Sequence, residues 1–172
     1  RLAHSLYVDL PQCPLKIRQI LFGIGVIAFF ASIPYLYDGM VSGADLTYHL
    51  HRIEGVKDGL LTGQFPVRLE PRWVFDHGYA NGIFYCNLLL YFPALLRMAG
   101  FTMTESYAFY CIGLNIATAA IAWYCFNGIF KDRIIGLVCS ALYTLSIFRF
   151  FKLVMVGAVG EGSAYTFLPL VV

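Results

Sequence analysis

The sequence predicts an all-α membrane protein, a polytopic transmembrane helical bundle with an interfacial helix in its first outer loop. The first observation is composition, because 59% of the 172 residues are hydrophobic and only 13% are charged. Soluble domains carry roughly 45–50% apolar and about 25% charged residues. The mean hydropathy of +0.70 agrees with this. The last observation is the pattern, in which apolar runs of about spanning length are separated by polar stretches.

Net charge and cysteine content exclude two classes of function. A formal net charge of +2 is too small to indicate nucleic-acid binding. We therefore expect the lipid bilayer as a partner and no nucleic acid. The five cysteines form no CxxC pair, and their spacing supports neither a zinc site nor a disulfide framework.

The polar residues 1–18 form a pre-membrane segment, and residues 20–36 form the first predicted span. This span contains no charged residue and is about long enough to cross roughly 30 Å of hydrocarbon. Lys16 and Arg18 precede it, which favours a cytoplasmic N-terminus. The chain does not begin with Met and ends inside an apolar run at Val172. We therefore expect residues 1–172 to be the N-terminal fragment of one longer transmembrane domain.

Residues 37–85 are more polar and are predicted to form an outer loop. Apolar side chains recur near a 3.6-residue period from Asp45 to Leu61, which predicts an amphipathic helix. A helix this short is expected to lie along the interface. Its predicted polar face carries Arg52, Lys57 and Asp58. Its predicted apolar face carries Leu46, His49, Leu50, Ile53, Val56, Leu60 and Leu61.

Four further apolar segments follow this loop. Residues 84–99 are short and interrupted by Pro93, whereas residues 106–130 form a clear span. Residues 134–148 form a shorter span, and residues 154–172 begin a further helix.

The short segment 84–99 leaves two topologies open. If it crosses the bilayer, Lys131 and Arg133 lie outside, against the positive-inside rule. If it is re-entrant or in-plane, both bases face the cytoplasm, and Glu161 lies on the same outer face as Asp45. We favour the second topology because it obeys the rule.

Asp45 and His49 are four residues apart, so they share a face of the predicted helix. Asp45 has two interpretations. As an acid at a helix start, it serves as an N-cap or a partner of the helix dipole. As a carboxylate at the membrane surface, it acts as a general base or a metal ligand.

Two other sets of charged side chains are candidates for a site. Arg68 and Arg72 could hold a phosphate, because guanidinium forks match phosphate oxygens, or they could anchor the loop at the interface. Glu161 lies inside an apolar run, where a carboxylate is costly and indicates a functional site. The surrounding Gly157, Gly160 and Gly162 allow close helix approach, so we expect this carboxylate to face protein or a cavity.

Three stretches together carry a family resemblance. They are SGADLTYHLHRIEGVKDGLLTGQFPVRL, GYANGIFYCNLLLYFPALLRMAG and LYTLSIFRFFKLVMVGAVGEGSAYTFLPLVV. From about residue 20 to the end, the chain resembles the bacterial YfhO-like membrane proteins. That group includes proteins described as 6-pyruvoyl-tetrahydropterin-synthase-related, although no pterin chemistry is expected. The family is similar to the GT-C type of glycosyltransferase, so the resemblance implies the N-terminal part of a GT-C-like fold.

The resemblance implies a function, partners and a location. The full-length protein would be a glycosyltransferase that takes a sugar from a polyprenyl-phosphate-linked donor. It would transfer that sugar to a glycan or a lipid-linked acceptor at the outer face of the bacterial plasma membrane. Some members of the broader superfamily use a divalent metal ion, but no cofactor is fixed by this sequence. The fragment alone is expected to be inactive.

The resemblance also implies site residues. Asp45 would be the catalytic carboxylate, and Asp45 and His49 would be the ligands of any metal. Arg68 and Arg149 would be candidates for the carrier phosphate. The implied substrate-binding residues are His49, Arg52, Arg68, Arg149 and Glu161. One departure from the family pattern is that no base lies directly before Gly160, since the nearest is Lys152.

Two rival functions stay open on the sequence. A transporter or flippase-like protein would need intramembrane charges along a route, and only Glu161 fits that description. A non-catalytic scaffold subunit would use Asp45 merely as a helix cap. Convergence of Asp45, Arg149 and Glu161 in one outward-facing cavity would favour the transferase.

Overall fold

The structure is a computed structural model that describes residues 15–37 and 43–171. These residues contain helices and turns, with no β-strand among them and one isolated bridge between Glu70 and Tyr79. The prediction of an all-α fold is therefore confirmed. Most of the predicted pre-membrane segment, residues 1–18, lies outside the described residues.

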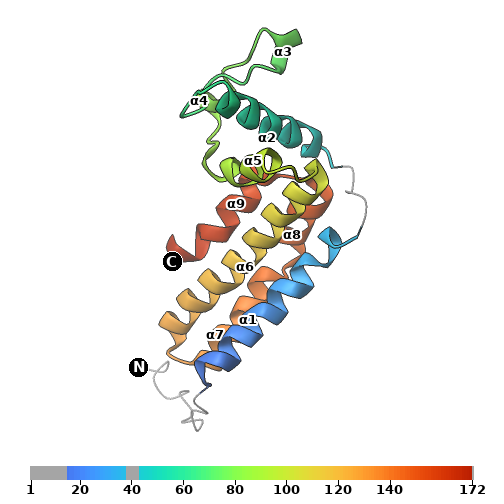
Figure 1. Ribbon diagram of the computed structural model, residues 1–172. Coiled ribbons are helices and arrows are strands. Elements are labelled where there is room, and N and C mark those ends of the chain that lie inside the picture. Colours follow the sequence, from blue (N-terminus) through green and yellow to red (C-terminus); the bar gives the residue numbers. More distant parts are fainter. Residues whose placement is uncertain (1–14, 38–42, 172) are drawn as a thin grey trace.

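Two helices in the described part of the chain are long and apolar enough to cross a membrane (Figure 1). They are α1, Ile17–Ser32, which continues into the 3-10 turn η1 over Ile33–Tyr35, and α6, Met103–Phe130. A third candidate is the pair formed by α7, Arg133–Thr144, and the helical segment Ile147–Val156, which are bent by 42°. These helices are compatible with a membrane protein, while a polytopic bundle with an interfacial helix stays a prediction.

Side-chain caps define the hairpin of α6 and α7. Thr102 Oγ1 accepts from the backbone N–H of Glu105 at 3.2 Å, and Glu105 Oε2 accepts from that of Thr102 at 2.8 Å. This capping box satisfies two donors at the start of α6. Lys131 ends α6 with a left-handed φ of 56°. Asp132 then caps α7 by accepting from the N–H of Ile134 at 2.7 Å.

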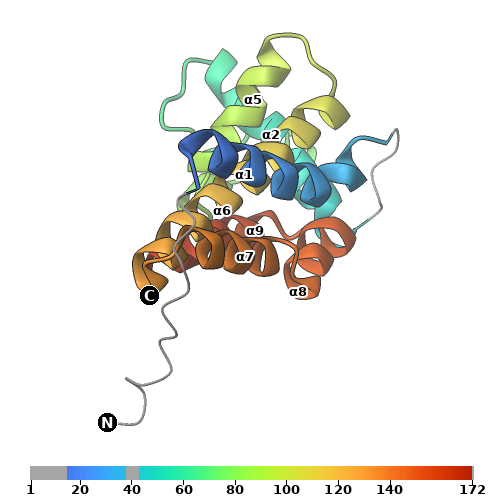
Figure 2. The same ribbon diagram turned by 90° about the horizontal axis from the view of Figure 1, so that it is seen from below.

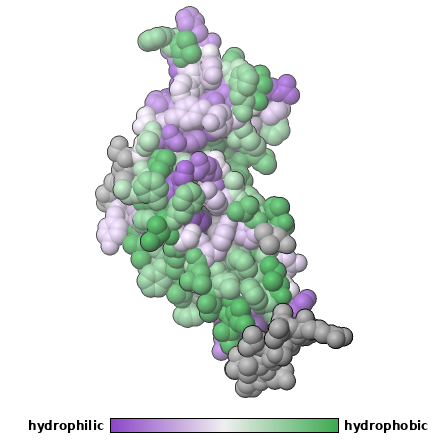
Figure 3. All heavy atoms as spheres, turned by 180° about the vertical axis from the view of Figure 1, so that it is seen from behind, coloured by the Kyte–Doolittle hydropathy of each residue, from purple (hydrophilic) through white to green (hydrophobic). Residues whose placement is uncertain are grey.

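The long helix α6 is the centre of the bundle. It packs against α1, α7 and α9, Val159–Phe167 (Figures 1 and 2). On α1 the residues that pack near Ala119 of α6 recur at helical spacing: Ile20, Ile24 and Ile27. Hydrophobic surface covers much of the bundle, and hydrophilic surface gathers towards the end that carries α2 to α4 (Figure 3). Burying such a surface in lipid is favourable.

The predicted span over residues 134–148 is divided in the structure. Helix α7 ends at Thr144, and α8, Ile147–Phe150, begins after Ser146, whose φ of −59° and ψ of 137° are extended. Ser and Thr are poor residues for a helix interior because their side chains compete for backbone hydrogen bonds. A π-helical turn, Phe151–Val156, follows α8 and ends at Gly157, whose φ of 72° favours glycine.

An outer layer lies across one end of the bundle (Figure 1). It contains α2, Leu46–Leu61, two short turns called α3, Trp73–Asp76, and α4, Asn81–Phe84, and helix α5, Tyr91–Met98. Helix α2 agrees with the helix expected from the 3.6-residue period. Its Ile53 and Val56 are fully buried in a core that reaches Leu90, Ala94 and Tyr110.

The segment predicted as short or re-entrant, residues 84–99, is not one helix. It contains the end of α4, a 3-10 turn over Leu88–Leu90 and helix α5. The apolar helical part, Leu88–Met98, is about 16 Å long at 1.5 Å per residue. This is about half of the roughly 30 Å that a span requires. Its placement relative to the bilayer stays a prediction.

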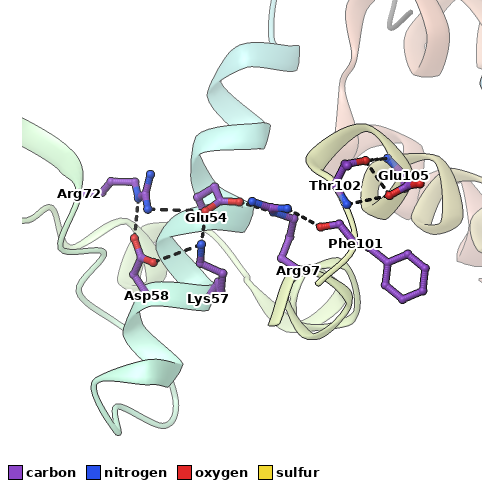
Figure 4. Close-up of polar contacts among 8 residues, drawn as sticks. All are labelled: Glu54, Lys57, Asp58, Arg72, Arg97, Phe101, Thr102 and Glu105. Atoms are coloured by element: carbon purple, nitrogen blue, oxygen red, sulfur yellow. Dashed lines mark hydrogen bonds and ion pairs between the residues drawn. The ribbon is translucent and has the colours of Figure 1, made fainter. Parts of the chain in front are cut away.

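An ion network joins the outer layer together (Figure 4). Glu54 of α2 accepts from Arg97 Nε of α5 at 2.5 Å and from Lys57 Nζ at 2.5 Å. Arg72, in the loop after α2, lies 3.6 Å from Glu54 and donates to Asp58 at 2.5 Å. The network therefore ties α2 to α5 and to the loop between them.

The network also controls the ionisation of Glu54. Burial alone would raise the pKa of this carboxyl. The hydrogen bonds from Lys57 and Arg97 outweigh burial and lower the pKa below its ordinary value. A carboxylate with a lowered pKa in the folded state stabilises the fold above its unfolded pKa, and this stability is lost as the pH falls through the folded pKa.

We expect Glu54→Gln to lower the free energy of unfolding by about 1–3 kcal/mol at pH 7, because hydrogen bonds to a charged group are lost. The variant should also lose less stability than the parent protein between pH 6 and pH 3. Thermal unfolding of the purified protein in detergent measures both effects. Asp76→Asn is the matched control, because Asp76 is exposed and its φ of 64° suits asparagine. Equal stability of Glu54→Gln and the parent at pH 7 would contradict the role of the network.

Candidate functional site

Three predicted site residues follow one face of α2. Asp45, His49 and Arg52 are spaced i, i+4 and i+7, so they lie one above another along the helix. Asp45 is exposed at the N-cap position, yet within the described residues its side chain makes no capping hydrogen bond. Its backbone N–H donates to the carbonyl of Val156 at 2.9 Å, which fixes the start of α2 against the π-helical turn.

His49 is buried and remains neutral. Its exposed fraction is 5%, and its Nδ1 lies 3.3 Å from Arg52 Nη1. Burial, followed by the charge of Arg52, lowers the pKa of His49 to about 4, and Asp45 opposes this shift. The neutral ring can therefore accept a hydrogen bond from Arg52 through Nδ1.

Arg52 was placed on the polar face of the helix by the sequence pattern, and this was wrong. Its exposed fraction is 2% because the chain from 67 to 87 covers this face of α2. Arg52 Nη2 donates to Asn87 Oδ1 at 2.6 Å and to the Cys86 carbonyl at 3.2 Å. The guanidinium carbon also lies 4.9 Å from the Tyr85 ring centroid. No carboxylate pairs with Arg52 in residues 15–37 or 43–171.

A buried carboxyl group, Glu70, lies behind Arg52 and was missed in the sequence. It accepts from Trp73 Nε1 at 2.7 Å and from the amide groups of Asn81 and Asn87 at 3.3 Å each. Burial raises the pKa of Glu70, and these hydrogen bonds and the charge of Arg52 offset only part of that effect. Nothing in the local sequence indicates this burial, because a glutamate before a proline in a loop is ordinarily solvated.

Arg52 contributes to a cavity of about 240 Å³ between the outer layer and α9. Most of its walls are apolar, and one polar pair, Tyr110 and Ser163, joins their hydroxyl groups at 2.8 Å. The cavity is lined by Arg52, Tyr85, Leu89, Tyr110, Val159 and Phe167, among others. A buried cation within an apolar cavity matches an anionic group that carries an apolar chain.

Glu161 lies in a second group of charges near Asp45. It occupies the first turn of α9, and its side chain is 52% exposed rather than enclosed as expected. It forms an ion pair with Lys152 at 2.8 Å. Asp45 is close enough to Lys152 to interact with it electrostatically. Lys152, which the sequence indicated only as the nearest base, therefore connects two predicted site carboxylates.

The two remaining arginines lie elsewhere. Arg68 is exposed, and its side chain has no partner among the described residues, whereas its backbone N–H donates to Gln64 Oε1. Arg149 is 4% exposed and lines a different cavity within the bundle. Neither Asp45 nor Glu161 is among the described residues that line these two cavities. Convergence of Asp45, Arg149 and Glu161 in one cavity, which would favour the transferase over a scaffold subunit, is therefore not observed among the described residues.

Metal ligands do not gather around Asp45 and His49. In the part of the chain that the structure describes, no group of three or more His, Cys, Asp or Glu residues could hold a metal ion. Cys86, Cys111, Cys125 and Cys139 are unpaired, and Cys13 lies outside the described residues.

Comparison with known proteins adds no family assignment. No protein-family model matches the chain, no curated protein matches it, and no solved structure matches it. Over the residues that the structure describes, the fold is all-helical, with two helices long and apolar enough to cross a membrane, or three if the bent pair is counted as one span. The YfhO-like resemblance stays a prediction.

We expect acidification to destabilise the protein through His49. The pKa of His49 is about 4 in the folded protein and about 6.5 in the unfolded chain. The contribution of His49 to the free energy of unfolding is therefore fully present above pH 6.5 and is lost as the pH drops towards 4. The loss at pH 5 is about 2 kcal/mol by linkage. Unfolding temperatures in detergent at pH 7 and pH 5 measure it. His49→Gln should remove this part of the pH dependence, whereas the exposed His77→Gln should retain it. The same pH dependence in both variants would refute the assignment to His49.

Proposed function

We propose that this chain forms part of a membrane-embedded glycosyltransferase that uses a polyprenyl-phosphate-linked sugar donor at the outer face of the bacterial plasma membrane. The observation that carries the proposal is Arg52. Its buried guanidinium has no paired carboxylate among the described residues, lies in a largely apolar cavity and shares a helix face with the exposed Asp45.

In this proposal Arg52 binds the carrier phosphate. The Asn87 and Cys86 oxygens hold one guanidinium nitrogen, and Arg52 Nε has no partner among the described residues. A positive charge held in place before the reaction stabilises the negative charge that develops on a phosphate leaving group. The apolar walls contributed by α9 suit an isoprenoid chain.

Asp45 would then accept the proton of the acceptor hydroxyl group. It is seven residues from Arg52, which is about 10 Å along a helix at 1.5 Å per residue. This rise along α2 separates the proposed phosphate-binding group from the proposed base. Lys152 is close enough to Asp45 to interact with it electrostatically, and a carboxylate placed beside an acceptor hydroxyl group can serve as its general base. The full transfer site would also need groups that bind the acceptor.

The arrangement of basic residues supports an outward-facing site. Arg133 Nη1 donates to the Leu15 carbonyl at 2.7 Å, so the start of α1 and the α6–α7 turn lie together. Lys16, Lys131 and Arg133 therefore gather at the end of the bundle opposite to the outer layer (Figure 1). The positive-inside rule would place that end in the cytoplasm and the outer layer outside.

We expect Asp45→Asn in the full-length protein to lower sugar transfer about 10²–10⁴-fold, because general-base catalysis is lost. Expression and unfolding temperature should not change, since the Asp45 side chain caps no helix in the described residues. The assay measures transfer from a polyprenyl-phosphate sugar in proteoliposomes. Asp76→Asn, on the same outer layer, is the control. Transfer at the parental rate in Asp45→Asn would exclude a catalytic role.

A second substitution tests the cavity. A Cβ at Gly160 would meet no atom of another described segment within 4 Å, and Gly160 lines the cavity, so Gly160→Leu adds a larger side chain at the cavity wall. We expect at least a tenfold higher KM for the lipid-linked donor, because the leucine occupies the proposed chain-binding space. Gly113→Leu is the matched control, because Gly113 is exposed on α6 and equally open. An unchanged KM in Gly160→Leu would show that the donor binds elsewhere.

A further inference from the structure

Arg149 is a buried cation inside the bundle, and no carboxylate in the described part of the chain balances its charge. The side chain extends from α8 towards α6 and α7, and only 4% of the residue is exposed. Within residues 15–37 and 43–171 it forms no ion pair with a carboxylate. An unpaired buried charge costs several kcal/mol, and in a membrane-spanning bundle such a charge indicates a functional site.

Arg149 uses only some of its N–H donors in hydrogen bonds to the described residues. Nη1 donates to the Thr144 carbonyl at 3.2 Å, and Nη2 donates to Thr118 Oγ1 at 2.9 Å. A guanidinium has five N–H donors. Nε has no partner in the described residues, although it is buried. The side chain is thus held in position by two neutral oxygens and retains unused donors.

A cavity of about 130 Å³ adjoins this guanidinium. Three other buried polar atoms without a hydrogen-bond partner among the described residues belong to its lining residues, namely Tyr35 Oη, Thr144 Oγ1 and Asn115 Oδ1. Buried polar atoms almost always have partners, so these three atoms and Arg149 Nε, four unpartnered atoms on residues around one cavity, indicate an occupant. The apolar part of the lining is formed by Phe30, Ala31, Leu145, Phe150, Leu153 and Val154.

We propose that this cavity binds a small monovalent anion of halide size, held by Arg149 and the Thr144 hydroxyl group. One guanidinium balances one negative charge, whereas a dianion would leave a net charge among apolar side chains. Thr144 and Arg149 Nε supply donors, and a water molecule can link the anion to the acceptor Asn115 Oδ1. The cavity has space for both, because one water needs about 10–15 Å³.

The site is separate from the cavity of Arg52. The two cavities share no lining residue. The anion would lie beside the break between α7 and α8 and would connect Thr144, before the break, with Arg149, after it. Binding should therefore stabilise the bent pair, whatever the outcome for glycosyl transfer.

Chloride titration of the purified protein tests the proposal. The protein is placed in phosphatidylcholine nanodiscs in sodium gluconate, and chloride replaces gluconate at constant ionic strength. We expect a saturable rise in unfolding temperature, because a ligand that binds only the folded state stabilises it. Arg149→Gln should abolish the rise. Thr144→Val, which keeps the side-chain shape and Arg149, should raise the apparent Kd for chloride at least tenfold.

Lys131→Gln is the control, because it removes a positive charge at the opposite end of the bundle and should retain the rise. A saturable rise that persists in Arg149→Gln would overturn the proposal, and so would the absence of any chloride effect in the parent protein. If Arg149→Gln does not fold, an unchanged Kd in Thr144→Val overturns it instead. A rise that requires phosphatidylglycerol and not chloride would assign the cavity to a lipid headgroup and would also overturn it.

Discussion

The carboxylate of Glu54 receives hydrogen bonds from Lys57 and Arg97, and the position of α2 over the bundle depends on these contacts. A sixteen-residue helix is barely stable alone, so its register must come from tertiary contacts. Arg97 also donates to the Phe101 carbonyl just before α6, which links the network to the central helix. Through this link the layer that carries Asp45 and Arg52 is held on the longest helix of the described chain.

The two buried arginines, Arg52 and Arg149, both carry a positive charge away from water, and different neutral groups surround each guanidinium. Arg52 has aromatic rings, an amide oxygen and a neutral histidine around it, and it adjoins a cavity next to the outer layer. Among the described residues, Arg149 donates hydrogen bonds to a hydroxyl and a carbonyl alone, and it is buried in the bundle. Neutral dipoles solvate a cation but leave its net charge, so each arginine can attract an anion. The larger, mostly apolar cavity suits a chain-bearing ligand, and the smaller one suits an ion.

The sequence predicts those features that depend on local composition. Helices α1 and α6 were found because each contains a long uncharged run, and α2 was found from its period. The break at Ser146 was missed because apolar residues continue on both sides of it. The burial of Arg52 and Glu70 was missed because residues distant in sequence cover them. The local pattern of apolar and polar residues gives no signal of such a contact. Arg149 was a phosphate-binding candidate through the family resemblance, but its burial was not predicted, because it directly follows an apolar run.

Asn87 explains how a buried carboxyl group and a buried guanidinium can coexist without neutralising each other. Its side-chain oxygen accepts from Arg52 at 2.6 Å, while its nitrogen donates to Glu70 at 3.3 Å. The amide therefore separates two charges that would otherwise form a direct ion pair. The raised pKa of Glu70 means that a larger fraction of this carboxyl group is neutral at any given pH, so Glu70 compensates the positive charge of Arg52 less. A direct ion pair with Glu70 would have neutralised the charge of Arg52. The hydrogen bond to Asn87 instead holds the Arg52 side chain in place and leaves its positive charge to attract a ligand.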